Sequence, residues 1–343
     1  MTKILMTGGG APGAPGILKC LKKDSSLDVY VCDANENATG KHLNEKFFPV
    51  PKANDANFAN VVLEKCLANQ IQIVLPLVTR ELFVFAREKK MFESKGIKVL
   101  VSDELPLNIA NDKSRLYEFL RLNKIEVPNF RVVNTVDQFE KAAKDLGYPQ
   151  KKFCFKPSVS NGSRGFRIVD DDADEFDLLF NHKPNSTYIS YSNIISILSK
   201  NSFPQLLLSE VLPGEEYSVD CVADKGKCKI IVPRIRSKMI NGISVEGEFI
   251  ENKEIIDYSE KIIEAIGLHG NIGVQVKKSE TGKFLILEIN PRVQGTIVSA
   301  LGAGVNLPLL AVKQELGLQI NPEELQVKWG TKFSRFWDEV FYT

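Results

Sequence analysis

Short apolar runs alternate with amphipathic segments over the first hundred or so residues of the chain. The apolar runs predict strands at Lys3–Thr7, Val29–Asp33, Ile71–Leu75 and Lys98–Ser102. Helical spacing of apolar residues predicts helices between them, at Ile17–Lys23, Phe58–Ala68 and Glu81–Lys90. Nearly continuous apolar strands that alternate with helices are typical of a parallel sheet covered on both faces. We therefore predict a doubly wound parallel α/β domain at residues 1–105.

Beyond residue 103 the pattern changes to a mixed α+β organisation. Asn111 or Asp112 can cap a helix that runs to about Leu122. A further helix is predicted at Asp257–Ile266, and strands at Phe153–Lys156, Phe166–Val169, Leu206–Ser209, Glu216–Ala223, Cys228–Pro233, Gly273–Lys277 and Phe284–Asn290. The last two strands form a hairpin. A second division near residue 205 splits this half into parts 106–205 and 206–343.

Composition and charge exclude several classes of protein. The chain is 43% hydrophobic and 25% charged, as soluble enzymes commonly are, and its net charge of +1 gives no field to attract nucleic acid or an anionic membrane. The N-terminus reads as a strand that enters a glycine turn, not as a signal peptide. No apolar stretch approaches the ~18 residues that span a bilayer. We expect a cytoplasmic protein without nucleic-acid or membrane partners.

Cysteine and histidine patterns suggest neither a zinc site nor a nucleophile–base pair. The six cysteines are scattered and none forms a C-x-x-C pair, which favours reduced, buried thiols. There are three histidines, His42, His182 and His269. None of them has another histidine or a cysteine at the sequence spacing of a metal-ligand pair. The sequence therefore does not favour a mechanism that needs a histidine base.

The C-terminal hairpin is the most informative stretch of the sequence. Residues two apart on a strand share a face, which groups Glu288 with Asn290, and a four-residue hairpin turn would place Gln275 beside them. Their oxygens are the ligands that Mg²⁺ prefers, with ATP phosphates completing its shell. The alternative is the polar outer face of an edge hairpin. Arg292 follows in Pro-Arg-Val-Gln-Gly-Thr, where a guanidinium can clamp a carboxylate or a transferring phosphoryl group.

Two lysines are candidates for binding phosphate. Lys156 ends a strand and enters a loop rich in glycine, serine and N–H donors, and such loops can wrap phosphates and close as lids. An ordinary hairpin loop explains the same residues about as well, and the pattern is not a Walker A motif. Lys113 lies in the first turn of a capped helix, where ammonium and helix dipole both attract anions. A solvated surface lysine is the simpler alternative.

The segment from Glu210 to Asp220 follows an apolar strand and is a candidate for contacting a nucleoside. The end of such a strand offers backbone groups to an adenine ring, and Glu216 can accept hydrogen bonds from ribose hydroxyls. The alternative is a β-turn at Pro213-Gly214 between two strands.

These four pieces, in this order, resemble the ATP-grasp superfamily, and most of all its carbamoyl-phosphate-synthase-type and carboxylate–amine ligase branch. The resemblance spans nearly the whole chain. It implies a two-subdomain ATP-grasp fold behind the N-terminal domain, with a lid in 106–205 and a metal site in 206–343. ATP with Mg²⁺ or Mn²⁺ would bind between the subdomains and activate a small-molecule carboxylate as an acyl-phosphate. An amine or similar nucleophile would then displace phosphate, and a homodimer is compatible with this picture.

The resemblance also implies roles for individual residues. Those that bind nucleotide would be Lys113, Lys156, Ser160, Gly162, Ser163, Glu210, Val211, Leu212 and Glu216. Within this set the lysines bind phosphates, residues 160–166 form a flexible lid, 210–212 line the adenine, and Glu216 holds ribose. The metal ligands would be Gln275, Glu288 and Asn290. The catalytic cations would be Arg292 at the acyl-phosphate, with Arg234 and Arg236 near the γ-phosphate.

The chain departs from the carbamoyl-phosphate synthases in two respects. Their synthase domains carry arginines where this chain has Lys113 and Lys156, and they carry two ATP-grasp units in tandem where this chain has one. Synthesis of carbamoyl phosphate itself is therefore not expected. A stand-alone ligase that acts on another substrate fits better.

A competing fingerprint lies near the N-terminus. Residues 8–13 match G-x-G-x-x-G between a strand and a helix, and Asp33 follows where a ribose-binding acid belongs, as in an NAD(P)- or flavin-dependent oxidoreductase. Pro12 and Pro15 weaken this alternative, because they remove N–H donors that would hold a pyrophosphate. A tight turn for close helix–strand packing is a third explanation. A non-catalytic ATP-binding regulator would have lost the metal ligands. We predict that the glycine loop contacts the substrate to be ligated, through Gly9, Gly10 and Gly13.

Overall fold

The computed structural model describes residues 1–160, 164–182, 187–240 and 242–342. These residues pack into two compact units. The first unit consists of Met1–Ala110, Glu215–Val276 and Leu287–Thr343, and the second of Asn111–Gly214 and Lys277–Ile286. The division at residues 105 and 205 stays a prediction.

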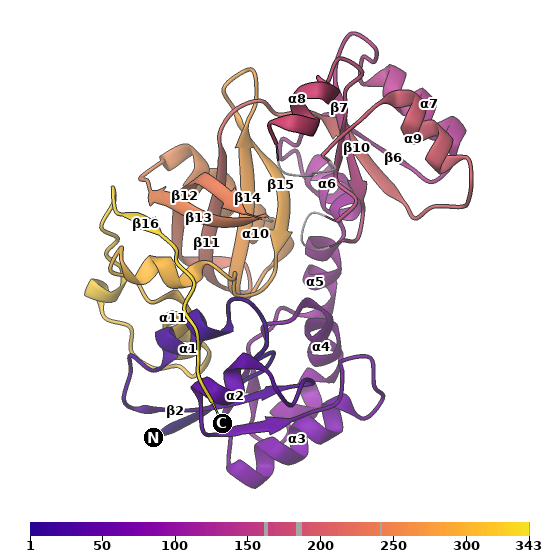
Figure 1. Cartoon of the computed structure of the whole chain (residues 1–343). Helices are drawn as coiled ribbons and strands as arrows, with labels where there is room; N and C mark the ends of the chain where they lie inside the picture. The colour runs from indigo at the N-terminus through magenta and orange to yellow at the C-terminus, as the bar shows by residue number, and fades with distance from the viewer. Residues whose placement is uncertain (161–163, 183–186, 241, 343) are drawn as a thin grey trace. The chain divides into compact units, whose positions relative to one another are not determined.

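The N-terminal part of the first unit is a five-stranded parallel sheet in the order β3-β2-β1-β4-β5 (Figure 1). Its strands are β1 (Thr2–Met6), β2 (Leu27–Asp33), β3 (Phe47–Pro49), β4 (Ile73–Leu75) and β5 (Lys98–Val99). Its helices are α1 (Ala14–Leu21), α2 (Thr39–Leu43), α3 (Phe58–Asn69) and α4 (Thr79–Glu93). This confirms the doubly wound α/β prediction. The strand order reverses between β1 and β4, and in open parallel sheets ligands bind beyond the carboxyl ends of the strands at such a point.

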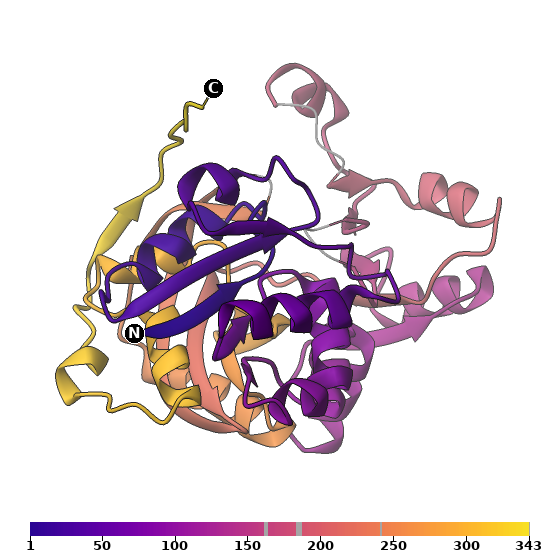
Figure 2. The same cartoon turned by 90° about the horizontal axis from the view of Figure 1, so that it is seen from below.

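Helices cover both faces of this sheet because successive strand residues point to opposite sides. Ile4 and Met6 pack with α1 on one face, whereas Leu5 packs with Phe58 of α3 and Phe85 of α4 on the other. The indigo and violet strands lie side by side in Figure 2. Burial on both sides explains the continuous apolar runs Ile4–Met6 of β1 and Ile73–Leu75 of β4.

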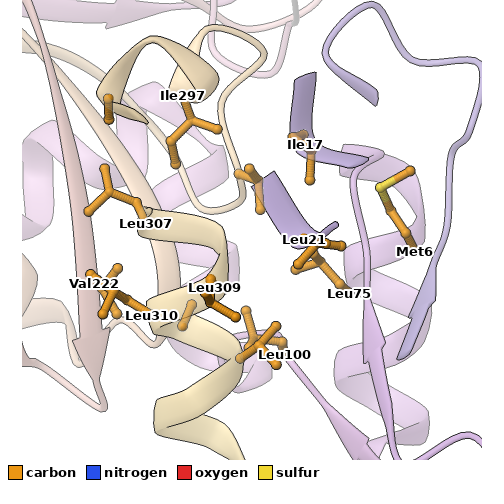
Figure 3. Packing of buried hydrophobic residues seen from close by; sticks show 14 of the residues in the cluster. Met6, Ile17, Leu21, Leu75, Leu100, Val222, Ile297, Leu307, Leu309 and Leu310 are labelled. Atoms are coloured by element: carbon orange, nitrogen blue, oxygen red, sulfur yellow. The ribbon is translucent and has the colours of Figure 1, made fainter. Parts of the chain in front are cut away.

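One hydrophobic cluster joins the N-terminal helix α1 to C-terminal segments of the same unit (Figure 3). Ile17 and Leu21 of α1 belong to it together with Ile297 of the 3-10 helix η1 (Ile297–Leu301) and Leu310 of α11 (Leu307–Glu315). Each fully buried aliphatic side chain contributes about 1.5–3 kcal/mol. Residues between Val293 and Val312 are therefore anchored in one core with the N-terminal sheet.

The first unit also contains a six-stranded sheet in the order β15-β14-β11-β12-β13-β16. Its strands are β11 (Glu216–Asp224), β12 (Lys227–Ile240), β13 (Ile243–Phe249), β14 (Gly270–Lys278), β15 (Phe284–Asn290) and β16 (Lys332–Ser334). Helix α10 (Lys253–Ile266) packs against β12 and β11, and the Asn252 side chain caps it by accepting from the Ile255 amide at 3.0 Å. β15 has the predicted bounds, whereas α10 begins four residues before the predicted start at Asp257.

The prediction that a strand ends at Pro233 is wrong, because β12 continues to Ile240. Proline lacks the N–H that a strand ladder uses, which made it resemble a strand end. In the structure Pro233 pairs with Val219 of β11, and its carbonyl accepts from the Ile250 amide at 3.1 Å. Arg234 and Arg236 therefore lie on a central strand, two residues apart.

The second unit is built on the sheet β6-β10-β7-β8-β9. Its strands are β6 (Phe130–Val133), β7 (Phe153–Pro157), β8 (Arg167–Val169), β9 (Tyr188–Ile189) and β10 (Leu206–Glu210). Its helices are α6 (Lys113–Leu122), α7 (Val136–Asp145), α8 (Glu175–Phe180) and α9 (Tyr191–Leu198), while α5 (Glu104–Asn111) precedes them in the chain. Asp112 caps α6 as predicted, accepting from the Ser114 and Arg115 amides. In the described part of the chain we find no helix that combines the length and apolar character needed to cross a membrane.

Candidate functional site

Two of the predicted metal ligands lie together on β15. Glu288 and Asn290 are two residues apart and both partly buried, and the Asn290 Nδ2 atom lies 3.4 Å from Glu288 Oε1. This long contact allows the amide to donate to the carboxylate. The alternation of a β-strand thus groups one carboxylate and one amide, as the sequence predicted.

Arg236 on β12 connects four strands of this sheet. Its Nη1 donates to Gln275 Oε1 of β14 at 3.1 Å and to the carboxylate of Glu216 on β11. Its Nε donates to Ser244 Oγ of β13 at 3.1 Å, and Nη2 to the Gly242 carbonyl at 2.5 Å. With 5% of its side chain exposed, the guanidinium has exchanged nearly all its water for protein acceptors. A predicted catalytic cation, a predicted metal ligand and a predicted ribose acceptor are thus in direct contact.

Electrostatics also link Glu288 to two arginines. Burial lowers the pKa of the Arg236 guanidinium, while the carboxylates of Glu216 and Glu288 oppose this shift. Burial likewise lowers the pKa of Arg292, and again the charge of Glu288 opposes it. Both shifts are those expected of cations removed from water beside anions. Glu288 therefore lies in the field of two arginines that come from different elements.

Arg292 lies in the loop 291–296, which follows β15. Its Nε donates to Thr79 Oγ1 at 3.1 Å, and its Nη1 to the Val293 carbonyl at 2.9 Å. Thr79 is the first residue of α4, just after the carboxyl end of β4. The N-terminal α/β domain thus holds the arginine that was predicted to face the acyl-phosphate.

Arg234 lies on the same strand as Arg236 but is completely buried. Its Nε donates to Asp220 Oδ2 at 2.9 Å, and both side chains are 0% exposed. Its Nη2 donates to the hydroxyl of Thr296 at the end of the loop 291–296. Arg234 therefore contacts other protein groups, and its predicted place near a γ-phosphate stays a prediction.

The donor chemistry of this region fits a hard divalent cation. Within the described ranges no three His, Cys, Asp or Glu side chains cluster as metal ligands. The candidate ligands are instead one carboxylate and two amide oxygens, from Glu288, Gln275 and Asn290. One carboxylate with neutral oxygens suits Mg²⁺, which is typically bound through one or two carboxylates plus substrate phosphates.

The two predicted phosphate-binding lysines lie in the second unit. Lys113 is buried at the start of α6, where its Nζ donates to the Ser160 carbonyl at 3.0 Å. The Nζ of Lys156, near the end of β7, lies 5.7 Å from the centre of the Tyr117 ring. The Tyr117 hydroxyl in turn donates to the Ile286 carbonyl at 2.7 Å. The contacts of both ammonium groups thus include a neutral group of their own unit.

The remaining predicted nucleotide residues lie after β7 and at the end of β10. The hydroxyl of Ser160 donates to the Pro157 carbonyl at 3.4 Å, while Gly162 and Ser163 lie outside the described residues. The Glu210 side chain accepts from the Asn129 amide at 2.7 Å. Val211 is half-buried and Leu212 buried. The side chain of Glu210 therefore already serves to join β10 to the chain before β6.

The N-terminal glycine loop binds its own aspartate. Asp33 Oδ2 accepts from the Gly10 amide at 2.8 Å, and Oδ1 accepts from the Asn35 amide at 2.7 Å. Helix α1 begins at Ala14, three residues before the predicted start at Ile17, and has Pro15 in its first turn. Both oxygens of the acid that an oxidoreductase would use for ribose are therefore engaged by backbone N–H groups.

Sequence reasoning missed several residues that support this region. Glu81 of α4 is buried and receives a hydrogen bond from the Thr7 hydroxyl, and burial raises the pKa of its carboxyl to about 7. Thr79, Ser244 and Asp220 were missed in the same way. Their contacts join distant strands and loops, so no local pattern in the sequence could have identified them.

Two parts of the chain match families of known proteins. Residues 4–100 match the family described as "PylC-like, N-terminal domain", and residues 202–334 match "ATP-grasp in the biosynthetic pathway with Ter operon". The carbamoyl phosphate synthase large chain of Clostridium botulinum is 24% identical over 319 residues, which are 88% of this chain and 27% of that protein. The corresponding protein of Thermoanaerobacter pseudethanolicus is 26% identical over 72% of this chain and 22% of its own. The chain thus spans about a quarter of the length of these relatives.

Solved structures with the same fold cover nearly the whole chain. Carboxyaminoimidazole ribonucleotide synthase from Aspergillus clavatus, complexed with ATP, has a TM-score of 0.71 at 16% identity, over 95% of this chain and 79% of its own. The biotin carboxylase domain of Hydrogenobacter thermophilus 2-oxoglutarate carboxylase, in complex with MgADP, has a TM-score of 0.68 at 17% identity, over 96% and 73%. An L-amino acid ligase from Bacillus licheniformis has a TM-score of 0.65 at 16% identity, over 95% and 78%.

Proposed function

We propose that this chain, an ATP-grasp protein with a PylC-like N-terminal domain, is an ATP-dependent ligase that activates a carboxylate and joins it to an amine. One observation carries the proposal. Glu288, Asn290, Gln275 and Arg236 are grouped on neighbouring strands, and Glu288 lies in the field of both Arg236 and Arg292. A carboxylate and amides beside two guanidiniums suit a metal-bound phosphate and the charge that develops on it.

In the proposed reaction the substrate carboxylate attacks the γ-phosphate of ATP, and ADP leaves. Arg292 and Arg236 would stabilise negative charge on the transferring phosphoryl group, and Lys113 and Lys156 would hold the phosphates. Mg²⁺, when bound by Gln275, Glu288 and Asn290, supplies further charge neutralisation. The amine then attacks the acyl carbon of the acyl-phosphate, inorganic phosphate leaves, and the amine loses a proton.

The proposal assigns the remaining residues as follows. Glu216 would hold ribose, and 210–212 with Ser160 would line the nucleotide. Arg234 would act near the γ-phosphate only if it moved from Asp220, so we favour a supporting role for it. Gly9, Gly10 and Gly13 would contact the substrate. The residue groups 1–105, 106–205 and 206–343 would be the N-terminal domain and two ATP-grasp subdomains.

The test is a screen for coupled turnover. ADP release is measured with ATP and Mg²⁺ against carboxylates and amines, starting with L-amino acids because one structural relative is an L-amino acid ligase. Hydroxylamine is added in a parallel set, because it traps an acyl-phosphate as a hydroxamate. Hydroxamate that forms only with ATP and one class of carboxylate supports the proposal. ADP release that never depends on a carboxylate would contradict it.

Two further measurements test the metal and the oligomeric state. Replacing Mg²⁺ by Mn²⁺ tests the metal, and sedimentation of the protein tests whether it forms a homodimer.

A further inference from the structure

We infer that the buried Asp220–Arg234 pair is a positioning device that fixes Arg292 through Thr296. Arg234 donates to Asp220 through Nε at 2.9 Å and to the hydroxyl of Thr296 through Nη2. Thr296 ends the loop 291–296, in which Arg292 lies. The inference rests on the proposed role of Arg292 at the transferring phosphoryl group.

Burial separates Arg234 from the other arginines of the region. Arg234 and Asp220 are both 0% exposed, whereas Arg292 is partly exposed. A pair sealed from water in this way cannot contact a ligand without a rearrangement. A buried ion pair also adds little net stability over apolar residues of similar size, because both charges lose their hydration. The hydrogen bonds of Arg234 fix the directions of its Nε and Nη2 atoms. A well-packed apolar pair would not provide this directional geometry.

Three contacts hold the loop 291–296. At its start, Arg292 donates to Thr79 Oγ1 at 3.1 Å. In its middle, Gly295 packs so tightly on Gly13 that a Cβ on Gly13 would lie 2.5 Å from the Gly295 Cα. At its end, Thr296 is buried and accepts from Arg234, just before η1 begins. Fixed at all three points, the loop leaves the Arg292 side chain little freedom to change direction.

The hydroxyl of Thr296 offers a clean way to remove one of these contacts. Valine has nearly the same shape as threonine but cannot accept a hydrogen bond, so Thr296→Val would leave the buried Nη2 of Arg234 without its acceptor. Arg234 Nη1 already lacks a hydrogen-bond partner within the described part of the chain. Serine keeps the hydroxyl and loses only a methyl group, so Thr296→Ser is the matched control. If only the hydrogen bond matters, serine restores what valine removes.

The decisive measurement is amide hydrogen exchange of the intact protein, without any substrate. We expect Thr296→Val to speed exchange across residues 291–301 about tenfold, while β11 stays protected and Thr296→Ser resembles the wild type. Unchanged exchange in 291–301 would overturn the inference, whatever the protein catalyses. Faster exchange throughout the first unit would also overturn it, because it would make Thr296 a general stability residue.

A second measurement asks whether the effect passes through Arg292. With a carboxylate and amine found by the screen, Thr296→Val should lower kcat about tenfold or more and leave the KM for ATP within about twofold. In an Arg292→Lys background, Thr296→Val should have almost no further effect. Independent, multiplicative losses would overturn the inference. If the wild type turns over no substrate, the proposed function fails, while hydrogen exchange still decides whether the loop is fixed by Arg234.

Discussion

The cations predicted to bind phosphate are held in opposite ways in the two units. In the first unit Arg236 donates to Glu216, Gln275 and Ser244, which come from three neighbouring strands. In the second unit Lys113 donates to a backbone carbonyl, and Lys156 lies over an aromatic ring. The guanidinium is a planar fork with five donors, whereas the ammonium is a compact charge on a flexible stem. Arg236 is therefore fixed in direction by several side-chain acceptors, whereas the contacts of the two ammonium groups include a carbonyl and an aromatic ring.

Because the arginine and the lysines are held differently, their replacement should affect the stability of the fold and the binding of ligand to different extents. Replacement of a buried arginine leaves its acidic partner without compensation, so it should weaken both the fold and the reaction. Replacement of either lysine removes a compact positive charge from the ligand site, so it should weaken binding more than it weakens the fold. Variants of these residues can therefore test whether the arginine and the lysines differ in this way.

The largest effect is expected for Glu288, the carboxylate that both arginines face. Glu288→Gln keeps the shape and removes the charge, so turnover of ATP should fall about a hundredfold or more at saturating Mg²⁺. The melting temperature should fall only modestly, because Arg236 keeps Glu216 and Gln275 as acceptors and Arg292 keeps Thr79 and the Val293 carbonyl. Glu280→Gln, in the exposed turn of the same hairpin, is the control. Near-normal turnover of a folded Glu288→Gln variant would remove Glu288 from the metal site.

The next prediction compares Arg236 with the lysines directly. Arg236→Met should lower the free energy of unfolding by about 3 kcal/mol, because the Glu216 carboxylate would lose its partner in a largely buried setting. Lys113→Met and Lys156→Met should weaken ATP binding about tenfold with far smaller losses of stability. Urea unfolding and calorimetric titration with ATP measure the two quantities, and Lys200→Met on the surface is the control. Equal losses of unfolding free energy in all three variants would show that the arginine contributes no more to stability than the lysines do.

Glu81 extends the comparison to a buried carboxylate that receives its hydrogen bond from a hydroxyl, not from a guanidinium. Burial raises the pKa of Glu81 from 4.5 to about 7, with the charge of Asp33 adding to the shift and the Thr7 hydrogen bond opposing it. Between these values the folded state binds more protons than the unfolded state, so stability falls as pH rises through this window. Glu81→Gln removes this dependence and should stabilise the protein at pH ~8 by on the order of 2 kcal/mol.

Urea unfolding between pH ~5 and ~8 checks this sign. Glu88→Gln on the same helix is the control, because Glu88 lies near the surface beside Arg87. A variant at Glu81 that keeps the wild-type pH dependence would mean that another group titrates in this window.

Local patterns predicted the elements of this fold far better than the contacts between them. The apolar strands β1, β2 and β4 and the cap at Asp112 follow from periodicity and from short-range hydrogen bonds. β12 was cut short at Pro233, although Pro233 keeps its place opposite Val219 of β11 and its carbonyl accepts from the Ile250 amide. The predicted ATP-grasp resemblance and fold agree with the family model that residues 202–334 match and with solved structures of the same fold, and the comparisons give no support to the oxidoreductase. The ATP-dependent activity stays a proposal.

The candidate site could be predicted only where one element holds its residues. Glu288 and Asn290 were grouped correctly because strand alternation alone places them on one face. The partners of Arg236 come from three other strands, and their positions depend on sheet order and register, which the sequence did not reveal. The Thr7–Glu81 contact joins residues 74 positions apart for the same reason. The roles of all these residues in binding stay predictions.

The smallest effect is expected in the N-terminal glycine loop, where the contrast is between two adjacent glycines. A Cβ on Gly9 would lie 2.5 Å from Val31 Cγ1, so Gly9→Ala should disturb the sheet. A Cβ on Gly10, which is exposed, would lie 3.2 Å from Asp33 Oδ2 and 3.4 Å from the Ala38 Cβ, which small shifts can accommodate. Gly10→Ala should therefore fold, raise the KM for the ligated substrate about threefold, and leave ATP affinity unchanged.

Calorimetric titrations of the wild type and Gly10→Ala with ATP, NAD and NADP test this division between substrate and dinucleotide binding. Tight binding of a dinucleotide that disappears in Gly10→Ala would revive the oxidoreductase. Because Asp33 already accepts from the Gly10 and Asn35 amides, we expect neither dinucleotide to bind.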